Sequence, residues 1–222
     1  MSLETKDAIN VRYSKLAEKS CCLSCGGAVN HIDIKEKDIC VDLGSGRGID
    51  VIKMAETTGE DGHVFGIDIS EGMIIKAKKN AEKFGVDNVT FINAELESLP
   101  IENEIVDVVI SNCTINHAKD KQKVWNEVNR ILKSTGYFIV SDIYSLKPVP
   151  EEYKNNPRAV AECWAGSVTK ETYIKQLENA GFKDLEIIEE SEPYKKGKIT
   201  VSSWTIKGMK ENNHYGYSCS CS

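Results

Sequence analysis

The chain has 222 residues, of which 41% are hydrophobic and 28% charged, a balance typical of one large globular domain with its own core. Its net charge of -6 argues against a nucleic-acid partner, because proteins that bind a phosphate backbone usually carry a basic stripe. No apolar run approaches the roughly 20 residues that cross a bilayer, and the N-terminus lacks the basic and apolar regions of a signal peptide. We therefore expect a cytoplasmic protein that acts on a small molecule, with no membrane partner.

Short β-branched runs alternate with longer amphipathic segments along the first 143 residues. The helix expected at 71–84 should begin after an N-cap at Ser70 and end at Gly85. This alternation is typical of a parallel sheet covered by helices. The expected strands are 38–44, 63–69, 88–94, 105–112 and 137–143, and the expected helices are 48–57, 71–84 and 120–133.

The rest of the chain should complete the same domain. A polar, proline-containing connection over 144–168 is expected to cross over the substrate side of the sheet, followed by a helix at 169–180 that Gly181 ends. Two strand-like runs come next, at 184–190 and 198–208. The predicted organisation is an N-terminal cysteine-containing arm or lid (1–34), a domain (35–208) and a polar, mobile tail (209–222).

The first expected strand ends in the sequence VDLGSGRG, residues 41–48. Glycines after a parallel strand let the backbone turn tightly and approach a ligand, but here the third glycine comes one residue too early for a dinucleotide fingerprint. Asp42 suits a ligand with a cationic amino group, and Asp68 can accept hydrogen bonds from both hydroxyls of a ribose. An adenosine that carries an amino acid would satisfy both ends.

The segments VDLGSGRG, GIDIS (66–70) and NAELESLP (93–100) together resemble the class I S-adenosylmethionine methyltransferases, over roughly residues 35 to 145. The resemblance implies a Rossmann-like α/β fold with a mostly parallel seven-stranded sheet, and S-adenosyl-L-methionine as the cofactor. Asn93 departs from the family, in which many members have an acidic residue there. The residues implied to bind the cofactor are Asp42, Gly44, Ser45 and Gly46 at the methionine end, Asp68 at the ribose, Ala94 and Glu95 by the adenine, and also Ile69, Met73 and Asn112.

Eight cysteines are more than a cytosolic chain of this size needs for packing, and a reducing compartment argues against a disulfide scaffold. Cys40 lies in an apolar run and is interpreted as a small core residue. Cys113 follows the fourth expected strand, at the edge of the sheet that faces cofactor and substrate, and Cys163 lies in the crossover segment. The other five are Cys21, Cys22, Cys25, Cys219 and Cys221.

Cys113 and Cys163 are the informative pair. A single cysteine after a strand is more often a packing residue, and His117 nearby is expected to be a surface loop residue. Two thiols that face one methyl donor suggest instead that the bound species is a soft electrophile, and trivalent arsenic is such a thiophile.

The segments 111–144 and 161–182, which contain SNCTIN and AECWAG, resemble the arsenite methyltransferases, and this resemblance covers about residues 10 to 190. It implies that Cys113 and Cys163 are the catalytic thiolate ligands of arsenic(III), whose lone pair attacks the methyl group without a general base. Relatives place a third thiol at the position of Val51. In this chain Cys21, Cys22 or Cys25 could supply it, and so could glutathione; a small thiol or a thioredoxin-type reductant is the expected partner.

Two other functions stay open. A methyltransferase for a quinone-type organic acceptor would use the same cofactor half, but it gives no reason for Cys113 and Cys163 to converge. A protein that binds a thiophilic metal without turnover would explain the eight cysteines but not the glycine loop. For the cysteines in 21–25 a metal-scavenging arm fits as well as a catalytic one, and for Cys219 and Cys221 a passive or accessory tail is preferred.

Overall fold

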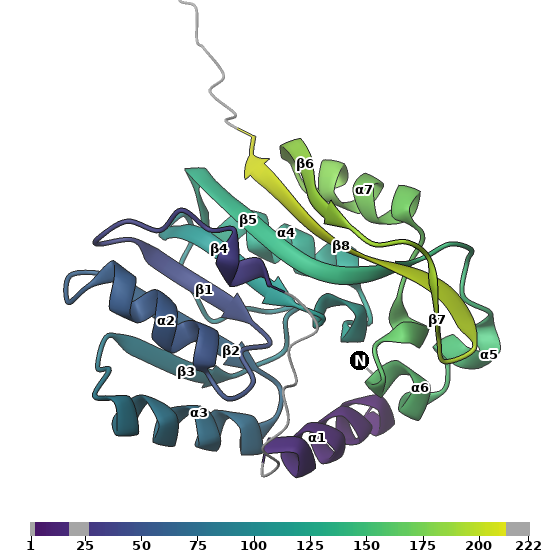
Figure 1. Ribbon diagram of the computed structural model, residues 1–222, viewed down its shortest axis with the longest axis horizontal. Helices are drawn as coiled ribbons and strands as arrows, with labels where there is room; N and C mark the ends of the chain where they lie inside the picture. The colour runs from purple at the N-terminus through teal and green to yellow at the C-terminus, as the bar shows by residue number, and fades with distance from the viewer. Residues whose placement is uncertain (1–2, 18–26, 212–222) are drawn as a thin grey trace, which may run out of the picture.

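The computed structural model describes residues 3–17 and 27–211 of the chain. Within them, eight strands form one sheet in the order β3-β2-β1-β4-β5-β8-β6, with β7 paired to β8 (Figure 1). The first five strands are mutually parallel, and the last three pair antiparallel. Their bounds are β1 (Ile39–Leu43), β2 (His63–Asp68), β3 (Val89–Asn93), β4 (Val106–Asn112), β5 (Leu132–Ser145), β6 (Phe182–Glu190), β7 (Tyr194–Lys196) and β8 (Ile199–Lys210).

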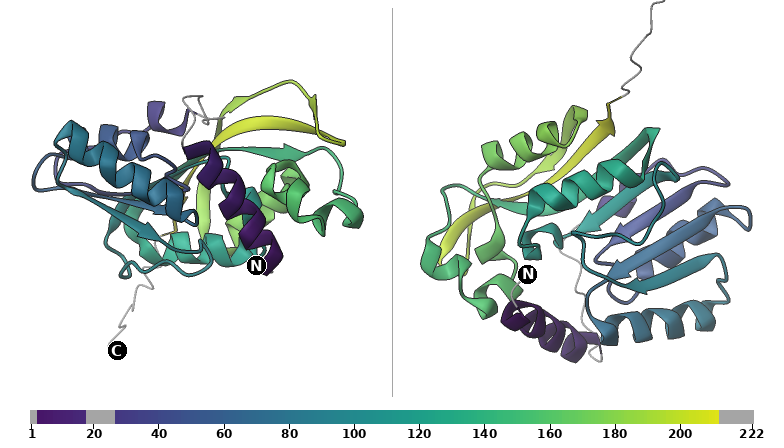
Figure 2. Two further views of the ribbon diagram at one scale, coloured as in Figure 1. Left: turned by 90° about the horizontal axis from the view of Figure 1, so that it is seen from below. Right: turned by 180° about the vertical axis from the view of Figure 1, so that it is seen from behind.

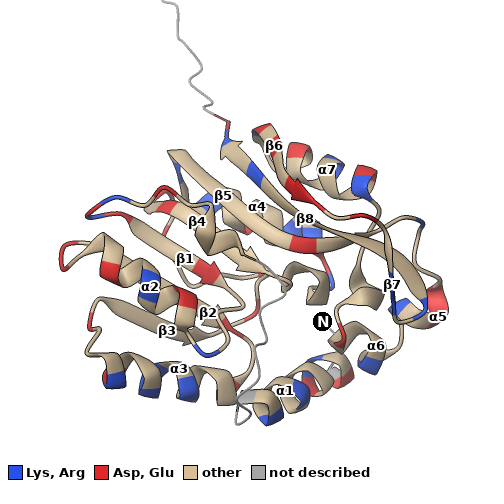
Figure 3. Ribbon diagram, viewed as in Figure 1, with Lys and Arg blue, Asp and Glu red and all other residues tan. Residues whose placement is uncertain are grey.

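Helices cover both faces of the sheet (Figure 2). On one face, α2 (Ile49–Thr58) and α3 (Glu71–Phe84) pack on a core that includes Cys40, and on the other, α4 (Lys121–Ile131) and α7 (Lys170–Asn179) pack on a core that includes Val41. Successive residues of a strand point to opposite faces, so Cys40 of β1 packs in one core and Val41 packs in the other. In Figure 3 the charges of both signs lie mostly on the helices and loops, and the inner strands carry few.

The direction in which the chain builds the sheet reverses at β1. The chain runs outward from β1 through β2 to β3 and then returns to place β4 on the other side of β1. The helix after β1 therefore covers one face and the helix after β4 covers the other, which leaves a crevice outside the carboxyl ends of these strands. Ligands of open α/β sheets bind in such crevices.

Short elements surround this crevice. The helix α1 (Leu3–Ala17) lies across the carboxyl ends of the strands and contacts α3 and α6 (Figure 2). The sequence did not predict a helix there, because most of its residues are polar. Among the α1 residues whose side chains are described, only Ile9 is fully buried. The other short elements are η1 (Ala28–Asn30), η2 (Ile115–His117), α5 (Glu151–Lys154), α6 (Pro157–Ala161) and η3 (Trp164–Gly166).

The expected fold class is confirmed, with differences at the ends of elements. The sheet has eight strands and not seven, because the three-residue β7 forms a hairpin with β8. The helix expected at 120–133 ends at Ile131, since β5 already begins at Leu132, and β8 continues to Lys210, two residues into the expected tail. The Lys210 side chain donates to the Leu132 carbonyl (2.7 Å) and holds that end of β8 against the sheet. No helix among the described residues has the length and apolarity that a membrane span requires.

Candidate functional site

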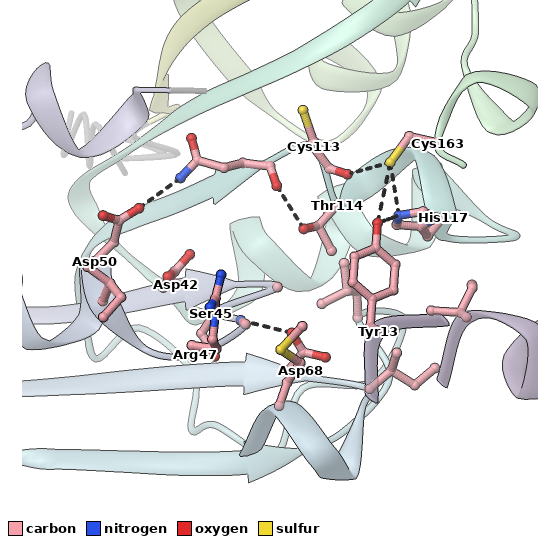
Figure 4. A pocket seen from close by; sticks show the side chains of 18 of the residues that line it. Tyr13, Asp42, Ser45, Arg47, Asp50, Asp68, Cys113, Thr114, His117 and Cys163 are labelled. Atoms are coloured by element: carbon pink, nitrogen blue, oxygen red, sulfur yellow. Dashed lines mark hydrogen bonds between the residues drawn. The ribbon is translucent and has the colours of Figure 1, made fainter. Parts of the chain in front are cut away.

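A cavity of about 440 Å³ lies at the carboxyl ends of β1, β2 and β4, in the size range of small-molecule sites (Figure 4). Most of the residues that the sequence selected line it. Of the residues expected to bind the cofactor, these are Asp42, Gly44, Ser45, Gly46, Asp68, Ile69, Met73, Ala94 and Asn112, and of those expected to bind the substrate, Cys113 and Cys163.

The glycine loop approaches the cavity with its backbone. Gly44 and Gly46 have φ angles of 78° and 52°, a region that disfavours side chains. A Cβ on Gly44 would overlap the side chain of Thr114, whereas a Cβ on Gly46 would meet no described heavy atom within 4 Å. Gly44 is therefore needed for packing, and Gly46 leaves open space beside the backbone for a ligand.

Asp68 fastens this loop to the end of β2. Its Oδ2 accepts a hydrogen bond from the Gly46 N–H (2.9 Å), and its Oδ1 accepts one from the Ser70 N–H (2.8 Å). Burial raises the pKa of Asp68, and the backbone N–H groups partly offset this. Each carboxylate oxygen can accept more than one hydrogen bond, so the side chain is oriented and can still receive the hydroxyls of a ribose.

The other end of the loop holds a buried carboxyl group. Asp42 is 3% exposed, and its burial, followed by the nearby charges of Asp50 and Asp68, raises its pKa well above the ordinary value. The buried Ser45 Oγ has no hydrogen-bond partner among the described residues. A cationic ligand group would stabilise the Asp42 carboxylate, and the Ser45 hydroxyl is available to a polar ligand atom, so these residues fit the amino-acid end of S-adenosylmethionine.

Asn112 ties three elements together at the cavity wall. Its Nδ2 donates to Asp50 Oδ2 on α2 (3.2 Å), and its Oδ1 accepts from the Ala28 N–H of η1 (3.2 Å). The side chain thus fixes the segment that follows residues 18–26 against the sheet.

The structure arranges the expected adenine end differently from the prediction. Ala94 lines the cavity, but Glu95 does not, and its carboxylate instead pairs with Lys6 of α1 (2.8 Å). The glutamate of this segment that lines the cavity is Glu97, whose Oε1 accepts from the Lys119 N–H (2.9 Å). Asn93 donates to the Asp68 carbonyl (3.0 Å) and so supports the end of β2 beside the cavity.

Cys113 and Cys163 come together from different elements (Figure 4). Cys113 follows β4, and Cys163 follows α6, with its Sγ 3.3 Å from the Cys113 carbonyl oxygen. Both have positive φ angles, 53° and 70°, a conformation that costs non-glycine residues on the order of 1–3 kcal/mol and often occurs at functional sites. The chain therefore holds both thiol-bearing residues at the cavity in a strained backbone conformation.

His117 was expected on the surface, and this was wrong. Its side chain lines the cavity and is only 7% exposed, because η2 turns the chain inward beneath α6. Its Nδ1 lies 3.0 Å from the Val160 carbonyl oxygen, and its Nε2 lies 3.0 Å from Cys163 Sγ. Burial lowers the pKa of His117 to about 4, so the ring is neutral at physiological pH. The sequence offered no signal for this position, which depends on a contact between distant segments.

The structure places some of the positions considered for a third thiol and does not describe the others. Val51 is fully buried in the core between α2 and the sheet and does not line the cavity, so a cysteine there would face the core in this conformation. Cys40 is also fully buried, as expected of a core residue. The five remaining cysteines lie outside the described residues: Cys21, Cys22, Cys25, Cys219 and Cys221.

Comparison with known proteins agrees with this geometry. The family model described as a methyltransferase domain matches residues 34–181, which is more than half of the chain. The chain belongs to this methyltransferase-domain family. The predicted methyltransferase family and the predicted fold are thereby confirmed, and S-adenosylmethionine is supported as the cofactor.

Several relatives of this methyltransferase-domain protein are named for arsenic. It is 36% identical to an arsenite methyltransferase of Halobacterium salinarum, over 77% of this chain and 44% of that protein, and 40% identical to the human arsenite methyltransferase, over 62% and 38%. A solved arsenic(III) S-adenosylmethionine methyltransferase from Chlamydomonas reinhardtii superposes with a TM-score of 0.72 at 27% identity, over 95% of this chain and 74% of that one. The chain spans less than half the length of the two curated relatives.

Proposed function

We propose that this chain transfers a methyl group from S-adenosylmethionine to trivalent arsenic held by the thiolates of Cys113 and Cys163. The observation that carries the proposal is the meeting of these two residues, which are 50 positions apart, at the substrate side of a methyltransferase cavity. The similarity to proteins named arsenite methyltransferases supports the same substrate.

The cofactor would be held by the residues that line the other side of the cavity. Asp42 would pair with its ammonium group, the backbone of Gly44 and Gly46 would lie along its methionine portion, and Asp68 would accept from its ribose. When bound, S-adenosylmethionine supplies the electrophilic methyl group that the arsenic lone pair attacks.

The task of the chain is to bind and orient arsenic. As each thiol reacts with arsenite, an arsenic–sulfur bond forms, an arsenic–oxygen bond breaks, and the thiol proton leaves with the hydroxide as water. Because arsenic keeps its lone pair, the protein needs no general base for methyl transfer, and it contributes mainly position and orientation.

A third ligand and a reductant complete the proposal. Arsenic(III) has three valences, so a thiol from Cys21, Cys22 or Cys25, or from glutathione, would occupy the third. Addition of a methyl group oxidises arsenic, and a small thiol or a thioredoxin-type reductant would return it to the trivalent state.

The expected location is the cytoplasm, because a reducing compartment keeps thiols available. Residues 35–210 would form the catalytic domain, with the crossover segment 144–168 on its substrate side.

The substrate can be tested by competition between acceptors. The protein is incubated with S-adenosylmethionine carrying a labelled methyl group and a thiol reductant, together with arsenite, with a quinol-type acceptor, or with no acceptor. We expect label in methylated arsenic only. Label in the quinol product, or arsenite bound without any transfer, would instead support one of the two other functions considered from the sequence.

A further inference from the structure

The thiol of Cys163 belongs to a hydrogen-bonded cluster that the proposed methyl transfer does not itself require (Figure 4). His117 Nε2 lies 3.0 Å from Cys163 Sγ and 2.9 Å from the hydroxyl of Tyr13, and this hydroxyl is 3.7 Å from the same sulfur. The three side chains come from η2, from α1 and from the turn after α6. Each pair within the cluster is therefore in contact.

The hydrogen-bonding roles of His117 follow from its neighbours. Its Nδ1 faces the Val160 carbonyl oxygen, which can only accept, so Nδ1 carries the hydrogen of the neutral ring. The acceptor nitrogen, Nε2, is then the atom that faces the Cys163 thiol and the Tyr13 hydroxyl. The Cys163 thiol hydrogen can be donated to Nε2 or to the Cys113 carbonyl oxygen (3.3 Å), which can only accept. In the first case the Tyr13 hydroxyl can donate to the sulfur, and in the second it can donate to Nε2.

The His117 ring is fixed to the turn that carries Cys163. The Val160 carbonyl oxygen accepts from His117 Nδ1 (3.0 Å) and also from the Cys163 N–H (2.9 Å). The ring is therefore held next to the strained backbone of Cys163. The contact between its Nε2 and Sγ then favours one orientation of the Cys163 side chain.

Tyr13 is placed beside this ring by the docking of α1. The Ser14 hydroxyl contacts the Ser70 hydroxyl at the start of α3 (3.1 Å), Lys6 pairs with Glu95, and Ile9 is 2% exposed. The Tyr13 ring meets the His117 ring edge-on, with 5.5 Å between centroids. Burial raises the pKa of Tyr13 above its ordinary value, so its hydroxyl keeps its hydrogen and remains a donor.

We propose that Tyr13 and His117 are positioning residues that direct the Cys163 sulfur toward arsenic, and that α1 is thereby part of the substrate site. The inference rests on the proposed function and extends it to two residues. Once arsenic has replaced the thiol hydrogen, the Tyr13 hydroxyl is the neighbouring donor that can reach both the sulfur and His117 Nε2. The cluster can thus form hydrogen bonds with the thiol before arsenic binds and with the arsenic-bound sulfur afterwards.

Three substitutions separate orientation from folding. Tyr13→Phe removes only the hydroxyl. His117→Asn can keep a donor near Nδ1 for Val160 but leaves nothing at Nε2, whereas His117→Gln can place a polar atom close to Nε2. His63→Asn is the matched control, because His63 bonds to Thr90 (2.9 Å) and does not line the cavity.

The readouts are affinity for a phenylarsenical, which binds two thiols, affinity for S-adenosylmethionine, and the KM for arsenite. We expect Tyr13→Phe and His117→Asn each to weaken phenylarsenical binding about two- to tenfold, the loss typical of one neutral hydrogen bond. Affinity for S-adenosylmethionine should stay at the wild-type value, and His117→Gln should recover part of the loss. Because the two residues share contacts, the double variant should lose less than the product of the single effects.

Wild-type phenylarsenical affinity in both single variants would overturn the proposal. So would an equal loss of affinity for S-adenosylmethionine, since that would mean a general disturbance of the site. Thermal unfolding of each variant checks the fold, and Tyr13→Phe carries the test if His117→Asn unfolds. Phenylarsenical binding is measured without S-adenosylmethionine, so this result is independent of whether the wild-type protein methylates arsenite.

Discussion

Asp42 is the residue at which the proposed cofactor binding and the stability of the ligand-free protein would oppose each other. Its carboxyl group is buried, and its raised pKa means that the folded protein without ligand binds this proton more tightly than the unfolded chain does. The free energy of unfolding therefore falls as pH rises above the ordinary value of a carboxyl group. A bound ammonium group would favour the ionised form and reverse this preference.

We predict that Asp42→Asn raises the unfolding temperature of the ligand-free protein at neutral pH but weakens S-adenosylmethionine binding by roughly 1.5–3 kcal/mol, the range for a hydrogen bond to a charged group. In the wild type, affinity should fall as pH is lowered through the raised pKa of Asp42, and in Asp42→Asn this dependence should be absent. Calorimetry across a pH series measures both. An unchanged pH profile in the variant would refute the assignment of Asp42 to the ammonium group.

Gly46 and Gly48 provide a matched pair within the glycine loop. Both have positive φ angles, so an alanine costs each about 1–2 kcal/mol of backbone strain. A Cβ at Gly46 enters open space beside the cavity, whereas one at Gly48 meets the Phe91 ring at 2.7 Å. We predict that Gly46→Ala mainly reduces cofactor affinity and that Gly48→Ala mainly lowers the unfolding temperature. Equal effects of the two variants on cofactor affinity would contradict the placement of the ligand beside Gly46.

The residues that could be predicted from the sequence share a local signal. Asp42, Gly46 and Asp68 stand at fixed offsets from the ends of strands, so recognising the strands also placed the residues. Tyr13 and His117 carry no such signal, because His117 meets Tyr13 of α1 and Val160 of α6 only in the folded chain. The same limit explains Glu97, which lines the cavity although the motif pointed to Glu95.

At the scale of elements, α1 changes how the N-terminal region is understood. The sequence suggested an N-terminal arm or lid over residues 1–34, and within it the structure shows that α1 is docked by Ile9 and by polar contacts to α3 and to Glu95. The strands and long helices were predictable because each shows a clear apolar pattern. The elements that were missed are polar or only a few residues long, so long-range contacts determine them. They are α1, η1, η2, β7 and the short helices of 144–168.

The docking of α1 also decides how a third arsenic ligand should be tested. Deleting residues 1–27 would remove Ile9 and Tyr13 from the cavity wall, so the cleaner variant replaces Cys21, Cys22 and Cys25 together by serine. If one of these thiols is the third ligand, this variant should lose affinity for arsenite, because an intramolecular ligand acts at high effective concentration. A phenylarsenical, with one valence occupied by carbon, should bind as in the wild type. Equal losses for both arsenicals would argue against a third ligand from this segment.

At the scale of the whole molecule, the described residues bring two half-sites to one cavity. The loops after β1 and β2 would form the cofactor half, and the turns after β4 and α6 form the thiol half, with α1 in contact with both. The chain spans less than half of the curated arsenite methyltransferases that it resembles, so its activity must be measured on this chain itself.

The most direct measurement of the central claim is transfer of a labelled methyl group to arsenite by the wild type, Cys113→Ser, Cys163→Ser and the buried-cysteine control Cys40→Ser, with S-adenosylmethionine affinity recorded for each. A serine oxygen is too hard a ligand to replace a thiolate on arsenic. We predict that the wild type and any folded Cys40→Ser methylate arsenite, and that Cys113→Ser and Cys163→Ser bind the cofactor normally but transfer no methyl group. Substantial methylation of arsenite by either of the latter two variants would contradict the two-thiol site.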